Sequence, residues 1–382
     1  MELKTKSIKG MTRALLMLIA ARAGCIGTED ETTEETEEAK PAFLDASDAG
    51  YTYASDVDNH RSLMQDLCDI KTAASDSNWD EAKNIYTNGK NAEKSDGSFR
   101  TLAGFAAASG KNHNYDTFYG QDGAIGAHIM AAMDGTGDFA GASDTVRYQG
   151  IAKLTANMGM VGYTIHELNA AVAKADAGNT DNDSGAPHNW DEGWAFFHGP
   201  DEHWSCSPAY TMKKRAADYG TETNGVSNAL AASEQAMVDG LAALQAGDEA
   251  GYDAATETVI KNIIITYSQA TLKYTMKMDN NESAAKYQAE GYAFWKTMEA
   301  YSADYTNACV HVDGNVTYVG NSGASSCGEN QTFDAKYGAD RINEILNLSD
   351  ASKHGTSYDV APHLEMVWAH YGITEDDIGT YQ

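Results

Sequence analysis

The feature that most constrains the fold is a short block that occurs twice in the same context. The pattern Glu-Gly-aromatic-Ala-Phe-aromatic stands at residues 192–197 (EGWAFF) and again at 290–295 (EGYAFW). Each copy follows a long, apolar-striped stretch that ends in Lys-X-Asp, and a loop rich in Asn, Asp and Ser lies between the stretch and the block. A repeat with matching flanks indicates a duplicated structural unit. We therefore predict two related helical units, at about 140–200 and 245–300, packed in one domain.

The stretches around the repeat have helical periodicity and few helix breakers. Leu63, Leu67 and Ile70 show this spacing within residues 58–74. The same character extends over residues 79–88, 120–133, 144–176, 220–246, 249–279, 340–348 and 358–370. Only 5 of the 382 residues are proline. The predicted fold class is all-α, a bundle-like domain built from two pseudo-repeated helical units. Residues 310–331, rich in Gly, Ser and Asn, are expected to form a loop with at most a short hairpin.

The N-terminus is typical of an export signal. Four basic residues within positions 4–13 precede the apolar run 14–21, which is too short to span a bilayer. The sequence Arg22-Ala-Gly-Cys25 resembles a lipobox, although Arg22 replaces the usual aliphatic residue. We predict a signal peptide at 1–25 with Cys25 as the lipidation site, an acidic disordered tether at 26–45, and one helical domain at 46–382. The protein is then extracytoplasmic and lipid-anchored, at the cell surface or in the periplasm.

Four cysteines remain once Cys25 is set aside. In an exported chain they indicate two disulfides, for which three connectivities are possible. Cys309 and Cys327 flank the loop-like stretch near the C-terminus, so we pair them as a staple of that loop. Cys68 and Cys206 are left to form the second bridge. The chain has no CxxC motif, which gives a zinc ribbon or a thioredoxin-type site no support.

The charge balance restricts the possible partners. Lys and Arg number 27 against 56 Asp and Glu, a formal net charge of −29. A nucleic acid needs a basic footprint, which this composition does not provide, whereas cations are attracted. The sequence also lacks a GxSxG elbow, a phosphate-binding P-loop and a dinucleotide-binding fingerprint. We therefore expect a binding protein and not an enzyme.

Several oxygen-bearing side chains fall on shared helix faces. Tyr163 and Glu167 share one by their i, i+4 spacing, and Tyr267 and Tyr274 share another. Pseudo-symmetric packing of the two units would bring the duplicated glutamates towards these residues. Carboxylate and phenolate oxygens suit hard cations, and ferric iron accepts phenolate particularly well. The candidate metal ligands are Glu192, Glu290, Tyr163, His166, Glu167, Tyr267, Tyr274, Asp191 and His198.

Each of these residues also has a structural interpretation. A glutamate in the first turn of a helix complements the helix dipole, and the glycine that follows it permits close helix packing. The tyrosines could be core residues whose hydroxyl groups reach the rim. The stretch 188–203, which carries Asp191 and His198, could equally be a solvated acidic loop.

Four blocks resemble one known family. They are WDEAKNIYTNGKN at 79–91, WDEGWAFFHG at 190–199, QATLKYTMKMD at 269–279 and AEGYAF at 289–294. Their order and context resemble the algal iron-assimilating, low-iron-inducible periplasmic proteins, which are related to the phytotransferrins. The similarity runs from about residue 50 to 310. It implies extracytoplasmic binding of ferric iron, Fe(3+), for high-affinity uptake, carbonate as a synergistic anion as in phytotransferrins, delivery to an uptake permease or receptor, and no catalysis.

Two other functions remain open on the sequence alone. One is an exported, imelysin-like metal-dependent peptidase that uses His166 and Glu167. Position 170 is Ala, however, where a zincin motif has its second histidine. The other is a non-catalytic surface or adhesion module in which the aromatic blocks serve packing alone.

Overall fold

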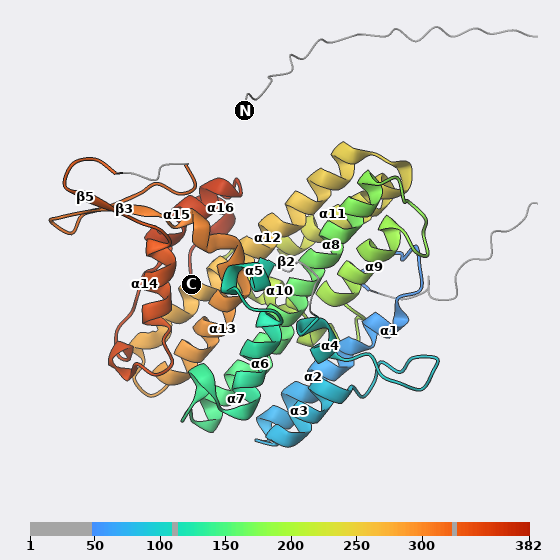
Figure 1. Cartoon of the computed structure of the whole chain (residues 1–382), viewed down its shortest axis with the longest axis horizontal. Helices are drawn as coiled ribbons and strands as arrows, with labels where there is room; N and C mark the ends of the chain where they lie inside the picture. Colours follow the sequence, from blue (N-terminus) through green and yellow to red (C-terminus); the bar gives the residue numbers. More distant parts are fainter. Residues whose placement is uncertain (1–47, 109–113, 323–326) are drawn as a thin grey trace, which may run out of the picture. The chain divides into compact units, whose positions relative to one another are not determined.

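The two copies of the repeated block lie on two helix pairs of similar design. The computed structural model describes residues 48–108, 114–322 and 327–382. The first pair is α8 (Met160–Asp176) with α9 (Ala186–Phe197), and the second is α12 (Glu249–Met276) with α13 (Ala284–Ser302). In each pair the helix that carries the block packs along the long helix that precedes it (Figure 1). The predicted all-α fold with two pseudo-repeated helical units is confirmed.

The remaining helices surround these pairs. In chain order they are α1 (Asp58–Arg61), α2 (Leu63–Ser75), α3 (Trp79–Asn88), α4 (Leu102–Ala106), α5 (Asn114–Tyr119), α6 (Ala124–Asp134), α7 (Asp144–Lys153), α10 (Pro208–Tyr219), α11 (Asn228–Ala246), α14 (Tyr337–Ile345), α15 (Ala361–His370) and α16 (Glu375–Ile378). The helix α11 packs along α12 and α9, and α7 packs against α13 and α2. Of the helices that the structure describes, none has both the length and the apolar character needed for a membrane span.

The duplicated block is a packing device in both units. A Cβ atom at Gly193 would lie 3.2 Å from Cδ2 of Leu168 on α8, and one at Gly291 would lie 3.3 Å from Cβ of Tyr274 on α12. Glycine therefore lets each block helix approach its partner closely. The phenylalanine of each block contacts a tyrosine of the preceding helix. The ring centroids of Tyr163 and Phe196 are 5.4 Å apart, and those of Tyr267 and Phe294 are 6.1 Å apart.

The stretch 144–176 is helical throughout but not uniform. A π-helical segment, Leu154–Gly159, joins α7 to α8. Such segments widen a helix locally and occur often at functional sites. Here the segment buries Asn157, whose Oδ1 accepts a hydrogen bond of 2.9 Å from the hydroxyl of Tyr267 on α12. Helical periodicity alone did not predict this change of pitch.

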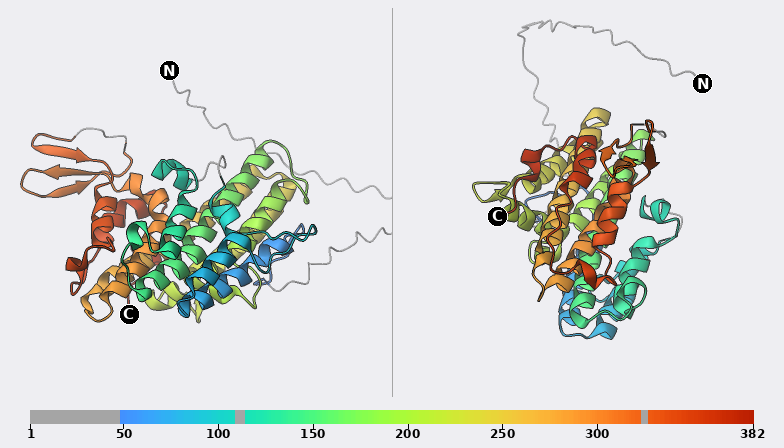
Figure 2. Two further views of the ribbon diagram at one scale, coloured as in Figure 1. Left: turned by 60° about the horizontal axis from the view of Figure 1, so that its bottom comes forward. Right: turned by 90° about the vertical axis from the view of Figure 1, so that its left-hand side faces the viewer.

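The C-terminal part adds a small sheet. Strands β3 (Ala308–His311), β4 (Val316–Tyr318) and β5 (Gln331–Asp334) form an antiparallel sheet in the order β4-β3-β5. It projects from one end of the helices (Figure 2). The predicted loop therefore contains more strand than a short hairpin, because β3 pairs on both of its edges. A second, two-stranded ribbon of β1 (Glu222–Thr223) and β2 (Val226–Ser227) precedes α11.

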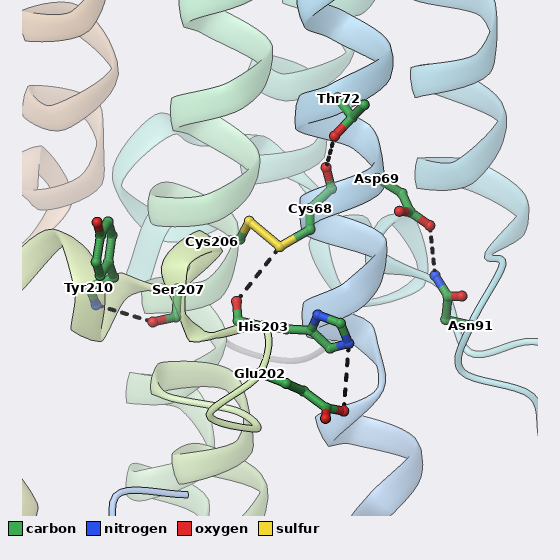
Figure 3. Close-up of a disulfide and its surroundings, with 9 residues drawn as sticks. All are labelled: Cys68, Asp69, Thr72, Asn91, Glu202, His203, Cys206, Ser207 and Tyr210. Atoms are coloured by element: carbon green, nitrogen blue, oxygen red, sulfur yellow. Dashed lines mark hydrogen bonds and ion pairs between the residues drawn. A yellow bond between two sulfur atoms is a disulfide. The ribbon is translucent and has the colours of Figure 1, made fainter.

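Both predicted disulfides are present. Cys309 and Cys327 staple the loop beside the small sheet, and Cys68 and Cys206 join α2 to the turn before α10 (Figure 3). The second bridge closes a loop of 138 residues, which strongly restricts the unfolded chain. The predicted signal peptide, the lipidation site at Cys25 and the acidic tether fall within residues 1–47, outside the described part of the chain.

A buried carboxylate, Glu299 of α13, connects three helices. It accepts hydrogen bonds of 2.6 Å from the hydroxyl of Tyr119 on α5, from Nζ of Lys296 and from Nδ2 of Asn343 on α14. Burial by itself would raise the pKa of Glu299, but Lys296 and the other donors outweigh it and hold the pKa below its ordinary value. The ionised form is thus the one that the fold stabilises.

Replacement of Glu299 by Gln removes this charge and should lower the free energy of unfolding at pH 7 by about 3 kcal/mol. Because the folded-state pKa is depressed, the contribution is present above the unfolded-state pKa and is lost as the pH falls through the folded-state value. Urea unfolding at pH 7 and at pH 3.5 should show that the variant loses less stability on acidification than the wild type. Glu344→Gln, an exposed substitution on α14, is the control and should change neither value. Equal acid sensitivity in Glu299→Gln and wild type would contradict this.

Candidate functional site

Glu192 of α9 is the centre of a cluster of ionisable side chains. Its Oε1 lies 3.2 Å from Nε2 of His60 on α1 and 3.1 Å from Nε2 of His188, one turn earlier on α9. The side chains of Glu192 and His60 are 14% and 6% exposed, so little water reaches them. A carboxylate buried to this degree is stable only when donors or cations surround it.

The protonation states suit a ligand-binding role. Burial would raise the pKa of Glu192, but the hydrogen bond with His188 and the charges of both histidines lower it below its ordinary value. Burial lowers the pKa of His60 to about 4, although Glu192 acts in the opposite direction. His60 is therefore a neutral imidazole near pH 7. The hydrogen bond to Glu192 raises the pKa of His188, against the effect of partial burial.

The orientation of His188 is fixed from its other ring nitrogen. Its Nδ1 lies 2.8 Å from the hydroxyl of Ser55, and that hydroxyl donates a bond of 2.9 Å to Oδ2 of Asp191. The hydroxyl proton of Ser55 is donated to Asp191, so the serine oxygen must act as the acceptor in its hydrogen bond with His188. The Nδ1 atom of His188 therefore carries a proton and donates it. Nε2 of His188 is then the nitrogen that faces Glu192. A support of this kind behind a histidine is typical of metal ligands.

Asp191 has a structural role. Its two carboxylate oxygens accept hydrogen bonds from the hydroxyl of Tyr51, from the backbone amides of Ala54 and Ser55 and from the hydroxyl of Ser55, at 2.8 to 2.9 Å. Burial nevertheless raises the pKa of Asp191 to about 6. Because its oxygens are used to hold residues 51–55 against α9, Asp191 supports the cluster rather than extending it.

The face of α8 predicted from sequence lies beside Glu192. Burial, together with the charges of Glu167 and Glu192, raises the pKa of Tyr163. Glu167 donates a hydrogen bond to Glu192 that helps to lower the pKa of the latter, and its Oε2 accepts one from Nδ2 of Asn189. The ring centroids of Tyr163 and His166 are 5.6 Å apart. The structure thus brings together the predicted residues of the first unit.

The predicted residues of the second unit lie elsewhere. Glu290 is on α13, whose neighbours are α12, α7, α14 and the π-helical segment, whereas α9 packs against α8, α11 and α1. The charge that acts on Lys153 most strongly is that of Glu290, and the hydroxyl of Tyr267 is bonded to Asn157. Tyr274 stacks on Phe294 at 5.5 Å. This packing gives no support to the expected convergence of Glu192 and Glu290 on one ion, because α9 and α13 have different principal neighbours.

His198 is a packing residue in this structure. Its ring stacks between those of Trp194 and Trp204, at 5.1 and 5.5 Å, and Nδ1 lies 2.7 Å from the carbonyl oxygen of Gly199. Burial lowers its pKa, so the ring is neutral. The expectation that His198 would join the metal ligands is not supported by this geometry.

Two residues that contact Glu192, His188 and His60, are not among the metal ligands predicted from the sequence. His188 has a readable signal, the i, i+4 spacing to Glu192 on one helix face. His60 has none, because it stands alone in α1 and reaches Glu192 only through the tertiary packing of α1 against α9.

The cluster is a set of pairwise contacts and not a formed metal centre. Within residues 48–108, 114–322 and 327–382, no group of three or more His, Cys, Asp or Glu side chains is arranged to hold a metal ion. Glu192 instead contacts each histidine directly. An ion bound here would have to take the place of these contacts, with the imidazole nitrogens turning from the carboxylate to the metal.

The supporting role of Asp191 can be tested with Asp191→Asn. An amide nitrogen would then face donors that need an acceptor, and the free energy of unfolding at pH 8 should fall by about 2 kcal/mol. Asp201→Asn is the matched control, because Asp201 is largely exposed and accepts a single bond of 3.0 Å from the backbone amide of Ala49. It should change stability by no more than about 0.5 kcal/mol. Equal losses in the two variants, measured by urea unfolding, would contradict the assignment.

Comparison with known proteins gives one finding. Residues 38–314, more than two thirds of the chain, match a family model described as low iron-inducible periplasmic protein. This range includes α1, α8 and α9, which form the cluster at Glu192, and it ends beyond β3. No curated protein and no solved structure matches the chain.

Proposed function

The chain belongs to the family of low iron-inducible periplasmic proteins, and on this premise we propose that it binds ferric iron outside the cytoplasm for high-affinity iron uptake. The observation that carries the proposal is the contact of one buried carboxylate, Glu192, with two imidazole nitrogens. The proposed role is that of a binding protein without catalytic activity.

The distances at Glu192 are compatible with shared coordination. Two ligand atoms bound to one ion through bonds of about 2.1 Å lie roughly 3.0 to 3.4 Å apart in octahedral or tetrahedral geometry. The contacts from Glu192 to His60 and His188, at 3.2 and 3.1 Å, are in this range. Replacement of the direct contacts by an ion therefore requires small side-chain movements.

Further candidate ligands for a trivalent metal ion lie on α8. Glu167 is hydrogen-bonded to Glu192, and Tyr163 lies close enough for the charge of Glu192 to raise its pKa. A ferric ion would lower the pKa of that phenol and could take it as phenolate, a ligand well suited to a hard cation. We propose Glu192, His60, His188, Glu167 and Tyr163 as the ligand set, with His166 at its edge.

The wider environment of the site fits uptake of a cation. The net charge of −29 draws cations towards the molecule. By analogy with the phytotransferrins, we propose carbonate as a synergistic ligand of the iron. We further propose that Cys25 carries a lipid anchor and that the iron is passed to an uptake permease or receptor. These proposals are supported by the leader-like sequence and the family resemblance.

Iron binding is tested by titration of the purified protein with chelated Fe(III), with and without bicarbonate. The wild type should bind one ion with a Kd below about 1 μM, with a tyrosinate-to-iron absorption band. Glu192→Gln and His188→Gln should each weaken binding by about 100-fold, because each removes a ligand. Glu290→Gln is the matched control in the second copy of the block, and it should leave affinity and absorption unchanged.

Four outcomes would contradict the proposal. The first is binding weaker than about 1 μM without an absorption band. The second is an equal effect of the substitutions at Glu192 and Glu290, which would point to a shared role in stability. The third is bound zinc with cleavage of peptides that a chelator abolishes, which would favour the imelysin-like peptidase. If neither Glu192→Gln nor Glu290→Gln changes the metal affinity, the surface or adhesion module is favoured.

A further inference from the structure

A cavity of about 80 Å³ has cationic walls in this acidic protein. It lies among α2, α7 with the π-helical segment, α10, α12 and α13. Its four charged lining residues are Lys71, Lys153, Lys214 and Arg215. None of the described residues that line it is Asp or Glu. In a chain with twice as many acidic as basic residues, four cations facing one space without a carboxylate indicate a specific purpose.

Arg215 has hydrogen-bonding capacity that the protein leaves unused. The residue is 4% exposed, and its Nη2 forms an ion pair of 2.8 Å with Asp218. Its Nε and Nη1 are buried and meet no acceptor with good hydrogen-bond geometry in the part of the chain that the structure describes, although the guanidinium group also lies against Tyr274, 5.5 Å from its ring centroid, and opposes the burial that raises the pKa of that phenol. Buried donors without an acceptor are costly, whereas a bound anion would satisfy both nitrogens of the guanidinium group.

Among the described residues, the three lysines also form no close ion pair. No carboxylate of the described residues lies within ion-pair distance of Lys71, Lys153 or Lys214. Lys153 is the deepest of them, and its Nζ lies 6.0 Å from the ring centroid of Phe294. Burial lowers the pKa of Lys153 to about 8. Glu290 opposes this shift, while the charges of Lys71, Arg215 and Lys214 add to it. The cations therefore repel one another across the cavity.

Hydroxyl groups and a helix N-terminus complete the lining. Ser205, Ser207 and Thr211 face the cavity around the first turn of α10. The Oγ of Ser207 accepts the backbone amide of Tyr210 at 3.1 Å, which leaves its proton available to an acceptor (Figure 3). The positive end of the α10 dipole favours negative charge at the same place.

A disulfide holds the two sides of this cavity together. Cys206 lines the cavity and is bonded to Cys68 of α2 (Figure 3). Lys71, which also lines the cavity, follows Cys68 by three residues and so lies one turn further along the same face of α2. The bridge thus fixes a lysine from α2 opposite the serines that precede α10. The donors are preorganised by a covalent bond and by helix packing, which reduces the entropy lost on binding.

We propose that this cavity binds a tetrahedral oxyanion with two negative charges, the class to which inorganic phosphate belongs. Four cations approach from three helices, and such a spread matches an anion with acceptor oxygens on all sides better than a planar anion with a single charge. The cavity volume is suited to an anion of a few atoms. It shares no lining residue with the cluster at Glu192, so the inference does not depend on iron binding.

The test is calorimetric titration of the full, metal-free protein with sodium phosphate at pH 7.5, with ionic strength held constant by sodium chloride. We expect one site with a Kd below about 1 mM. Lys153→Gln should weaken binding at least about tenfold, since it removes the most buried of the three lysine charges, and Lys214→Gln should weaken it by about threefold. Lys213→Gln is the control, because Lys213 lies next in sequence but contacts Trp204 instead of the cavity.

Glu192→Gln should bind phosphate as the wild type does, which separates this test from that of iron binding. Lys214 is exposed, so its substitution is compatible with folding and keeps the test valid if Lys153→Gln is unstable. The proposal is overturned if phosphate does not bind at 10 mM, about ten times the expected upper limit of Kd. It is also overturned if Lys213→Gln weakens binding as much as Lys214→Gln, or if bicarbonate binds the wild type more tightly than phosphate.

Discussion

Burial of charged groups between helices is the constraint on which this structure depends. A charge removed from water is stable only when donors, acceptors or opposite charges replace its hydration. Glu299 meets this condition, since its donors outweigh burial and hold its pKa below the ordinary value, whereas burial still raises the pKa of Asp191 despite several donors. Each of the two carboxylates joins separate elements of the bundle. Glu192 meets the condition through its contacts with two histidines, and a bound ligand could replace these contacts. Arg215 meets it only in part, since one of its nitrogens is paired and two are not.

The duplication preserves packing and changes the electrostatics. Gly193 and Gly291 both allow close approach of a block helix to the helix before it, and Phe196 and Phe294 both contact a tyrosine of that helix. The glutamates that precede these glycines have different neighbours. Glu192 is surrounded by imidazole and carboxyl groups, whereas Glu290 acts on Lys153. The two helix pairs therefore share the same packing of the block helix and carry two different charged environments.

Sequence periodicity and composition were sufficient for the fold class, the repeated units and the disulfide pairs. The helices and the Cys309–Cys327 staple are local and the units are duplicated, so spacing along the chain reveals them, whereas Cys68 and Cys206, 138 residues apart, were paired only by elimination. The face shared by Tyr163 and Glu167 was predictable for the same reason. The role of His60 was not, because α1 has one turn and its contact with Glu192 depends on tertiary packing. The cationic cavity was equally hidden. Lys71, Lys153 and Lys214 show no distinctive pattern on their own helices. Only the packing of α2, α7 and α10 places them around the same cavity.

The two charged environments are joined by a continuous helical segment. Lys153 ends α7 at the cavity, and Tyr163 lies on α8 beside Glu192, with the π-helical segment Leu154–Gly159 between them. Ten residues of helix span about 15 Å, so the two places are near without overlapping. The π-helical segment has a wider turn than an ideal α-helix. Its Asn157 accepts a hydrogen bond from Tyr267 of the second unit. A ligand that changed the position of Lys153 would act on the same continuous backbone that positions Tyr163. Lys153 and Tyr163, one from each charged environment, therefore lie on one continuous helical backbone.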